Sequence, residues 1–254
     1  VFHHLMIGRM RYEYHQRRKY AKEKNKILRN NTQFQVLHGP FQGLIYPEAV
    51  SFGSSLNPKL LGSYEKELHS LLEEIVKNNY SEVINIGCAE GYYAVGLAFR
   101  MINSRIYAFD INSRALSFCK KMAESNHVDD RIVLNGYCGP ETFYSIRISK
   151  KGLIICDCEG FEKELFTENN KEYFKKCDLL IEIHDFIDPG ISYYIKSLFQ
   201  ETHSLKTIQS IDDLIKCRMY EYDEIKKLDI YQKRIMLSEN RPTIMEWFFL
   251  SPIK

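Results

Sequence analysis

Apolar residues recur along the chain in two spacings, one typical of amphipathic helices and one typical of buried strands. Between residues 60 and 76 they return every three or four positions, which predicts a helix with one apolar face. Short, mainly apolar runs predict strands buried on both faces, at 83–86, 106–109, 132–134, 153–156 and 179–183. Helical patterns lie between or after these runs, at 92–101, 114–125, 163–166 and 192–199.

This alternation of strands and helices predicts an α/β fold with a doubly wound, mainly parallel, Rossmann-like sheet. A last apolar run at 243–250 predicts a closing antiparallel strand at an edge of the sheet. The chain before residue 58 differs, because glycines and prolines interrupt 34–58 and the segment before them is basic and helical in pattern. We therefore expect a basic helical and loop-rich extension at 1–57 and one α/β domain at 58–254.

The turn after the first strand has a spacing typical of nucleoside-binding sites. Gly87 and Gly91 stand four residues apart between an apolar run and a helix, and a backbone without Cβ atoms can bend sharply there and let a ligand approach. The N–H groups that open the following helix face the same space. We expect this turn to bind the ligand through Gly87, Cys88, Ala89, Glu90, Gly91 and Tyr92.

Asp110 ends the second apolar run, where a carboxylate can accept hydrogen bonds from both hydroxyls of a ribose. The turn lacks the first glycine of a dinucleotide motif, since Asn85 stands there, and Glu90 would place a negative charge beside a pyrophosphate. A ligand that carries a sulfonium and an ammonium suits that charge better. The pattern therefore favours S-adenosylmethionine over a nicotinamide dinucleotide.

Acidic residues mark the ends of two other predicted strands. The run at 153–156 leads into Asp157 and Glu159, and the run at 179–183 contains Glu182 and leads into His184. Side chains two residues apart in an extended chain share a face, and ligands of doubly wound sheets bind beyond the carboxyl ends of the strands. We therefore expect these four groups to converge beside the cofactor.

Together these motifs resemble the FkbM type of class I S-adenosylmethionine-dependent methyltransferases over roughly residues 60–200. The segments that carry the resemblance are 84–93, 109–112, 155–162 and 181–184. Asn85 departs from the acidic residue that commonly ends the first strand in this family, and Cys158 replaces a more usual aliphatic residue. The resemblance implies a Rossmann-like methyltransferase sheet, a cofactor contact at Ile111, and O-methylation, often of a sugar or polyketide hydroxyl.

Methyl transfer to an alcohol requires removal of the hydroxyl proton, which is held tightly at neutral pH. His184 or Asp157 could accept that proton, with Glu182 and Glu159 orienting the base or the acceptor. Alternatively, Asp157, Glu159, Glu182 and His184 could hold a divalent cation (Mg²⁺, Mn²⁺ or Ca²⁺), which hard oxygen ligands and one imidazole suit. In a third interpretation these residues are structural: Asp157 and Glu159 cap the next helix, and Glu182 pairs with His184.

Two further residues have a less specific signal. Tyr64 precedes the first strand and could reach the carboxylate or amine end of the cofactor, or lie on the surface of an amphipathic helix. Gly136 follows the third strand, where this fold usually contacts adenine. We include both among the expected cofactor contacts.

Length and composition suit one α/β domain with an extension. The 254 residues are 44% hydrophobic, which is enough for a full core. No apolar run approaches the roughly 20 residues that a bilayer span needs, and no signal-peptide pattern is visible at the start. The seven cysteines lack Cys-x-x-Cys pairs, which favours reduced thiols. We expect a cytoplasmic protein.

The charge is distributed unevenly. Between Arg9 and Arg29, nine Lys and Arg residues face two Glu residues, so this segment carries +7 and the rest of the +2 chain carries −5. A basic helix here could be solvated, join a homo-oligomer, lie on the inner face of an anionic membrane, or touch nucleic acid. Nucleic acid is the least favoured, because no stacking-aromatic motif or zinc spacing accompanies the charge.

The favoured function is O-methylation of a sugar, a glycan or a small-molecule hydroxyl. A nucleic-acid methyltransferase is an alternative, but an Asn/Asp-Pro-Pro-Tyr/Phe motif does not follow the fourth strand, where 157–160 stands instead. A catalytically idle S-adenosylmethionine-binding module is a second alternative, which the departure at Asn85 permits.

Overall fold

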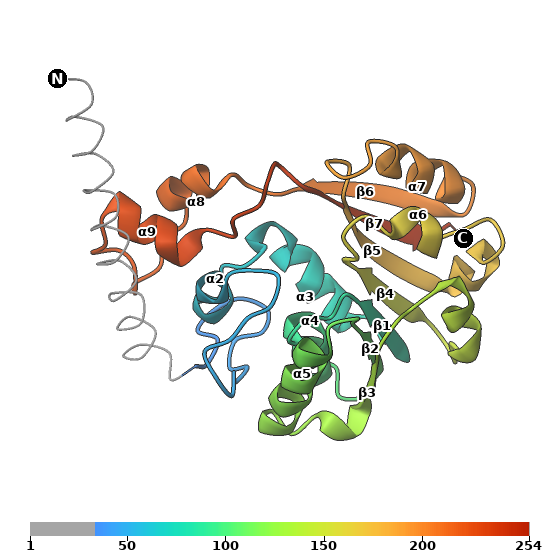
Figure 1. Cartoon of the computed structure of the whole chain (residues 1–254), viewed down its shortest axis with the longest axis horizontal. Helices are drawn as coiled ribbons and strands as arrows, with labels where there is room; N and C mark the ends of the chain where they lie inside the picture. The colour runs from blue at the N-terminus through green and yellow to red at the C-terminus, as the bar shows by residue number, and fades with distance from the viewer. Residues whose placement is uncertain (1–33, 254) are drawn as a thin grey trace.

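The computed structural model describes residues 34–253 (Figure 1). Its central sheet has seven strands in the order β3-β2-β1-β4-β5-β7-β6. They are β1 Glu82–Ile86, β2 Arg105–Phe109, β3 Ile132–Asn135, β4 Gly152–Cys156, β5 Cys177–Ile183, β6 His203–Gln209 and β7 Glu246–Pro252. The strands β1 to β5 pair in parallel, and β7 runs antiparallel to both β5 and β6. The prediction of a doubly wound, mainly parallel sheet is confirmed.

Helices cover both faces of this sheet, as Figure 1 shows. One face carries α3 (His69–Lys77), α4 (Tyr92–Arg100) and α5 (Ser113–Ser125), and the other carries α6 (Glu162–Leu165) and α7 (Ile191–Phe199). The remaining helices lie outside these layers: α2 Leu56–Leu61, α8 Asp213–Met219, α9 Ile230–Leu237, and the short η1 Lys66–Leu68, η2 Asp129–Arg131, η3 Pro140–Ser145 and η4 Lys171–Lys176.

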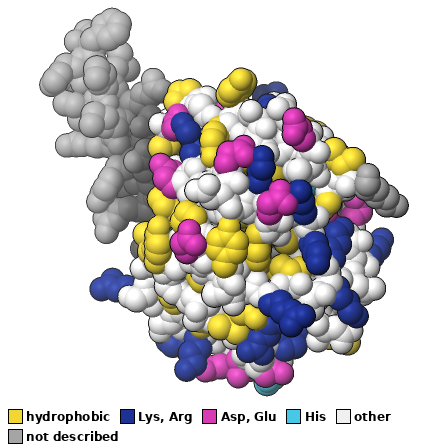
Figure 2. Space-filling view, turned by 90° about the vertical axis from the view of Figure 1, so that its right-hand side faces the viewer, with side chains coloured by type: hydrophobic (Ala, Val, Ile, Leu, Met, Phe, Trp, Pro, Cys, Tyr) yellow, Lys and Arg dark blue, Asp and Glu magenta, His cyan; other side chains and the backbone are white. Residues whose placement is uncertain are grey.

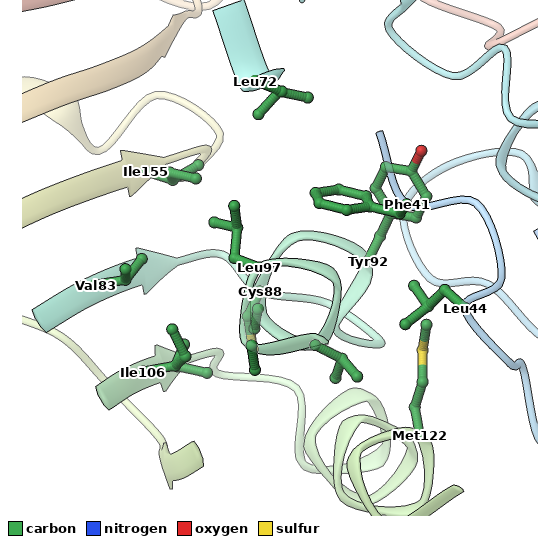
Figure 3. Close-up of a cluster of buried hydrophobic side chains, with 14 of the residues drawn as sticks. Phe41, Leu44, Leu72, Val83, Cys88, Tyr92, Leu97, Ile106, Met122 and Ile155 are labelled. Carbon is green, nitrogen blue, oxygen red and sulfur yellow. The ribbon is translucent and has the colours of Figure 1, made fainter. Parts of the chain in front are cut away.

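Side chains of the inner strands alternate between two cores. Val83 and Leu153 belong to the core under α3, α4 and α5, while Ile84 and Ile154 belong to the core under α6 and α7. Figure 3 shows the first core, with Leu72, Val83, Leu97, Ile106, Met122 and Ile155 among its labelled residues. Because both faces are covered, the inner strands are mostly apolar on both sides, which is why the sequence shows them as nearly continuous runs.

The predicted helix over 60–76 is interrupted. It is replaced by α2, a turn, η1 and α3. α2 ends at Gly62, where φ is +79° and a Cβ would lie 1.9 Å from the carbonyl oxygen of His38. Glu65 also has a positive φ of 47°. Apolar spacing continues on both sides of this turn, so periodicity alone did not reveal it.

The strand predicted at 243–250 is antiparallel, as expected, and begins at Glu246. It is not itself the edge strand that the sequence predicts, because β6 pairs along its outer side and forms the edge of the sheet. β6 has mostly exposed side chains and therefore no apolar run to predict it. Between β6 and β7 the chain forms α8, α9 and then a loop over residues 238–245, the return loop, which leads back to the sheet. Asn240 Nδ2 donates to Ser55 Oγ (2.7 Å), which ties this loop to the segment before α2.

The irregular segment predicted at 34–58 is irregular up to α2. Nevertheless it is packed, because Phe41, Leu44 and Tyr46 are buried in the first core. Figure 3 shows Phe41 beside Tyr92 of α4, where the two rings meet edge to face at 5.1 Å. The division of the chain at residue 58 stays a prediction, and the basic segment between Arg9 and Arg29 lies outside the described residues.

The described surface carries charges of both signs, and Figure 2 shows Lys, Arg, Asp and Glu side chains on one face. Within 34–253 no helix has the length and apolar character needed to cross a bilayer. The seven cysteines are free, and all but Cys158 are buried.

Candidate active site

A cavity of about 600 Å³ lies beyond the carboxyl ends of β1, β2, β4 and β5. In doubly wound sheets this is where ligands bind. Most of the residues predicted from the sequence line it: Tyr64, Gly87, Cys88, Ala89, Tyr92, Asp110, Ile111, Gly136, Asp157, Glu159, Glu182 and His184. Glu90 and Gly91 do not, and the structure gives them other roles.

Gly87 makes the bend between β1 and the cavity. Its φ is +73°, and a Cβ at this position would lie 1.7 Å from the carbonyl oxygen of Asp157. The neighbouring Ile86 carbonyl accepts a hydrogen bond from Asp157 N–H at 3.0 Å. Only glycine allows both the left-handed turn and this close approach of the ends of β1 and β4. Gly91 instead faces Cys119 of α5, where a Cβ would lie 2.6 Å from the sulfur.

Asp110 links the turn to the next helix. Its Oδ2 accepts from Ala89 N–H and its Oδ1 accepts from Asn112 N–H, both at 2.8 Å. Each carboxylate oxygen can accept a further hydrogen bond. Asp110 is therefore held rigidly at the cavity wall with capacity for the two hydroxyls of a ribose.

Glu90 is a structural residue in this geometry. Its buried carboxylate accepts from Lys59 Nζ at 2.5 Å, Ser51 Oγ at 2.9 Å and Phe52 N–H at 3.0 Å. Burial alone would raise the pKa of Glu90, but Lys59 lowers it below the usual value. The sequence-based role of Glu90 beside a ligand cation is therefore corrected: Lys59 neutralises it, and it anchors the segment 51–59 to the glycine turn.

Asn85 has a feature that the sequence did not reveal. Its side chain is buried at the cavity wall, and its Oδ1 has no hydrogen-bond partner among the described residues. Its Nδ2 makes one long contact, 3.5 Å to the carbonyl oxygen of Ile155. A buried acceptor without a donor costs about 1–3 kcal/mol. A ligand N–H donor at this position would remove that cost.

His184 is surrounded by four carboxylates. Its Nδ1 lies 2.6 Å from Glu162 Oε1. Its Nε2 lies 3.5 Å from Asp157 Oδ1, 3.7 Å from Glu159 Oε2 and 3.9 Å from Glu182 Oε2. The predicted convergence of Asp157, Glu159, Glu182 and His184 is therefore present. Glu162, the last residue of the segment 155–162, completes it, and the sequence analysis assigned it no role.

The charges around His184 alter its proton affinity. Burial would lower the pKa of His184, but the hydrogen bond and charge of Glu162, with further contributions from Glu182 and Glu159, raise it above the usual value. Burial and the charges of Glu182 and Glu65 raise the pKa of Asp157 well above its usual range. Both groups therefore bind protons more tightly than they would in water.

Three members of this cluster are arranged as metal ligands could be. One ligand atom from each of Asp157, Glu182 and His184 lies within 4.8 Å of the other two. Glu159, the fourth predicted ligand, is not in this group, and its side chain is 73% exposed. The donor set of two carboxylates and one imidazole fits a hard divalent cation.

Arg241 is a site residue that the sequence analysis did not assign. It comes from the return loop after α9, and its guanidinium pairs with Glu182 Oε1, with Glu65 Oε1, and with Glu239 Oε2 at 2.9 Å. Glu239 also pairs with the buried Lys216 of α8 at 2.5 Å. This network holds one oxygen of Glu182, and it connects the insertion between β6 and β7 to the site.

Aromatic and apolar groups complete the cavity. Tyr64 is buried and packs edge to face on Tyr92 at 5.2 Å, so it is part of the wall and not of the surface. At the rim Ile111 and Tyr137 are exposed, and a Cβ at Gly136 would meet open space. The rim therefore offers flat and apolar surfaces beside Asp110.

Comparisons with known proteins place this arrangement in a fold. No protein-family model matches the chain. A release factor glutamine methyltransferase of Flavobacterium psychrophilum is 26% identical over 129 residues, which cover 47% of this chain and 44% of that protein. The chain thus spans less than half the length of this curated relative.

Solved structures resemble a larger part of the chain. A Clostridium thermocellum protein assigned as an rRNA methylase is 12% identical, with a TM-score of 0.50 over 74% of this chain and 96% of that chain. TomG, an O-methyltransferase of Streptomyces achromogenes solved with S-adenosylmethionine, is 11% identical, with a TM-score of 0.48 over 76% and 83% of the two chains. The first likeness shows the fold alone, which is that of class I S-adenosylmethionine-dependent methyltransferases.

Proposed function

We propose that this protein is an S-adenosylmethionine-dependent O-methyltransferase of the FkbM type. Its acceptor is a hydroxyl of a sugar, a glycan or a small molecule. The observation that carries the proposal is that the glycine turn with Asp110 and the cluster around His184 open into one cavity. A donor and an acceptor can therefore meet between them.

The residues on the β1–β2 side suit the donor. Asp110 accepts from the ribose hydroxyls, the Gly87 turn lies against the methionine part, and Asn85 Oδ1 accepts from its ammonium group. Ile111 and Gly136 face the adenine. When bound, S-adenosylmethionine supplies a methyl group on a positively charged sulfur. The neutral thioether is the leaving group, and it needs no activation by the protein.

The residues on the β4–β5 side suit the acceptor. His184 Nε2 accepts the hydroxyl proton, and Asp157 and Glu182 orient the hydroxyl. Holding the reacting atoms in line can contribute roughly 7–11 kcal/mol. Tyr137 and Phe161, which meet edge to face at 6.1 Å, form an aromatic side of the cavity on which a sugar ring or a small apolar group can lie.

The cavity disfavours nucleic acid as the acceptor. Asp157 and Glu159 line the cavity, and their charges would repel the phosphodiester backbone of a nucleic acid. The described cations of the lining, Lys59 and Arg241, are already paired with carboxylates of the protein. Nucleic-acid binding depends on cations that face phosphates. The sugar or small-molecule acceptor is therefore preferred.

A divalent cation is a second candidate component, favoured by the ligand atoms of Asp157, Glu182 and His184. Bound there, it would lower the pKa of the acceptor hydroxyl in place of a protein base. Titration of the protein with Mn²⁺, followed by electron paramagnetic resonance, tests it. Saturable binding that Asp157→Asn abolishes supports the cation, and full activity after exhaustive chelation contradicts it.

The proposed function is tested first with the donor alone. Calorimetry should detect S-adenosylmethionine binding, and Asp110→Asn should weaken it about tenfold or more, the loss of one or two hydrogen bonds to a charged group. Asp130→Asn, an exposed carboxylate outside the cavity, is the matched control and should bind as the wild type does.

Methyl transfer is tested next, with labelled donor and a panel of sugars, glycolipids and oligonucleotides. Transfer to a hydroxyl compound supports the proposal. Absence of donor binding by folded wild-type protein refutes it. Donor binding without transfer to any acceptor favours the idle module, and transfer to an oligonucleotide favours the nucleic-acid alternative.

A further inference from the structure

Glu162 and His184 form a buried pair that neither the sequence nor the comparisons assign. Glu162 opens α6, and its carboxylate is fully buried behind the imidazole ring, which is itself only 2% exposed. The two side chains meet at 2.6 Å between Oε1 and Nδ1. Oε2 of Glu162 has no hydrogen-bond partner among the described residues. The pair is therefore a single defined contact.

This contact determines which nitrogen of the ring carries the proton. A carboxylate can only accept a hydrogen bond, so Nδ1 must be the donor. In the neutral ring the lone pair then lies on Nε2, the nitrogen that faces Asp157, Glu159 and Glu182 at the cavity. Nε2 is the atom that can take a proton from an acceptor hydroxyl.

We infer that Glu162 is a positioning residue, which fixes the ring orientation and the tautomer of His184 so that Nε2 acts as the base toward the acceptor. The catalytic meaning of this inference rests on the proposed methyltransferase function. Glu162 does not line the cavity, so it acts only through His184. The hydroxyl proton moves to Nε2, and the resulting imidazolium keeps its Nδ1–H bond to Glu162.

The pairing also explains why a carboxylate is kept in an apolar position. Glu162 lies beside the second core, and removing an isolated charge from water is costly. A charge-assisted hydrogen bond to the ring offsets part of that cost and becomes stronger when the ring is protonated. A neutral amide at this position could either accept from or donate to Nδ1, so it would not fix the tautomer, and it would stabilise the imidazolium less.

The tautomer is tested without any ligand. Protein labelled with ¹⁵N-histidine is compared by long-range ¹H–¹⁵N correlation NMR above the titration of His184, whose signals are assigned by their loss in His184→Asn. Wild type should show a protonated Nδ1, and Glu162→Ala should shift toward the protonated Nε2. A protonated Nε2 in the wild type, or an unchanged tautomer in Glu162→Ala, overturns the inference.

Kinetics distinguish positioning from a structural role. With an acceptor from the same panel, Glu162→Gln should lower kcat about 10- to 100-fold, while the donor Kd changes less than threefold. This loss is a part of the roughly 10²–10⁴-fold that general base catalysis contributes, because the base itself is retained. Glu82→Gln is the matched control, a buried carboxylate at the start of β1 that Ser149 holds, and it should keep the wild-type kcat. A parallel loss of donor affinity, or an equal loss in Glu82→Gln, overturns the inference.

The two proposals fail separately. If wild-type protein shows the protonated Nδ1 but binds no S-adenosylmethionine, the methyltransferase function is refuted and the pairing stands. If the donor binds and methyl transfer occurs while Nε2 carries the proton, the function stands and the role of Glu162 is refuted.

Discussion

Gly87→Ala should destabilise the protein more than alanine at any other glycine of the cavity wall. At Gly87 the substitution has two separate costs. The φ of +73° forces an alanine into the left-handed region, which costs about 1–2 kcal/mol. The added Cβ would also lie 1.7 Å from the carbonyl oxygen of Asp157, where real contacts stay beyond about 3 Å. The ends of β1 and β4 must therefore separate by more than 1 Å.

Overpacking of this kind typically costs a further 1–3 kcal/mol. We therefore expect Gly87→Ala to lower the free energy of unfolding by about 2–5 kcal/mol, as measured by urea denaturation. Donor binding, measured by calorimetry, should also weaken. The added Cβ displaces the backbone of Asp157, a residue of the cavity wall. It also disturbs the glycine turn, whose Ala89 N–H donates to Asp110.

Two other glycines of the same wall separate the two costs. Gly53 has a φ of +70° but open space around its Cβ position, and Gly136 has neither a left-handed φ nor a neighbour within 4 Å. Gly53→Ala should therefore lower the free energy of unfolding only by the cost of the left-handed backbone, and Gly136→Ala should leave it nearly unchanged. All three substitutions restrict the unfolded chain alike, so that contribution cancels. If Gly87→Ala is within 0.5 kcal/mol of Gly53→Ala, the steric reasoning fails.

Three further outcomes follow from buried charges. Lys59→Met leaves Glu90 buried without its cation and should lower the free energy of unfolding by about 3–5 kcal/mol, as measured by urea denaturation. Adding Glu90→Gln should recover at least half of that loss, and no recovery would contradict the pairing. Burial raises the pKa of Glu65 from 4.5 to about 7, so the folded protein keeps a proton that the unfolded chain releases. The free energy of unfolding should therefore fall by on the order of 3 kcal/mol as the pH rises from 4.5 to about 7. Glu65→Gln should reduce the difference in stability between denaturation curves at pH 5 and pH 8. Arg241→Lys keeps the charge but not the geometry that reaches three carboxylates. Thermal melts should therefore show a loss of stability that Arg105→Lys does not share, because Arg105 is exposed, lies outside the cavity and makes one side-chain hydrogen bond within residues 34–253, to the carbonyl oxygen of Asp130.

The part of the site that could be predicted comes from residues beside regular strands. Gly87, Asp110, Asp157 and His184 each stand where an apolar run ends or just after it, and parallel strands bring their carboxyl ends to one edge. Alternation along β5 then decides that Glu182 and His184 share a face. Local pattern and the parallel arrangement of the strands were sufficient to predict this convergence.

The part that could not be predicted depends on loops and on partners distant in the sequence. Arg241 reaches Glu182 and Glu65 from a return loop whose path is set by α8 and α9. Glu90 was expected to face the ligand, and it is turned away by Lys59, thirty-one positions earlier. Local periodicity carries no information on such pairs, because each is specified by the folded arrangement and not by spacing.

The excess of carboxylates around His184 has a physical consequence for the proposed reaction. Glu162, Glu182 and Glu159 all raise the pKa of the ring, so they favour the positive charge that appears on His184 as the acceptor loses its proton. Two of these groups are fixed before the reaction: Arg241 holds Glu182, and Glu162 lies buried at the start of α6. Charges already oriented toward a developing charge require no rearrangement during the reaction. The buried carboxylates therefore lower stability in the resting protein and lower the energy of the imidazolium when it forms.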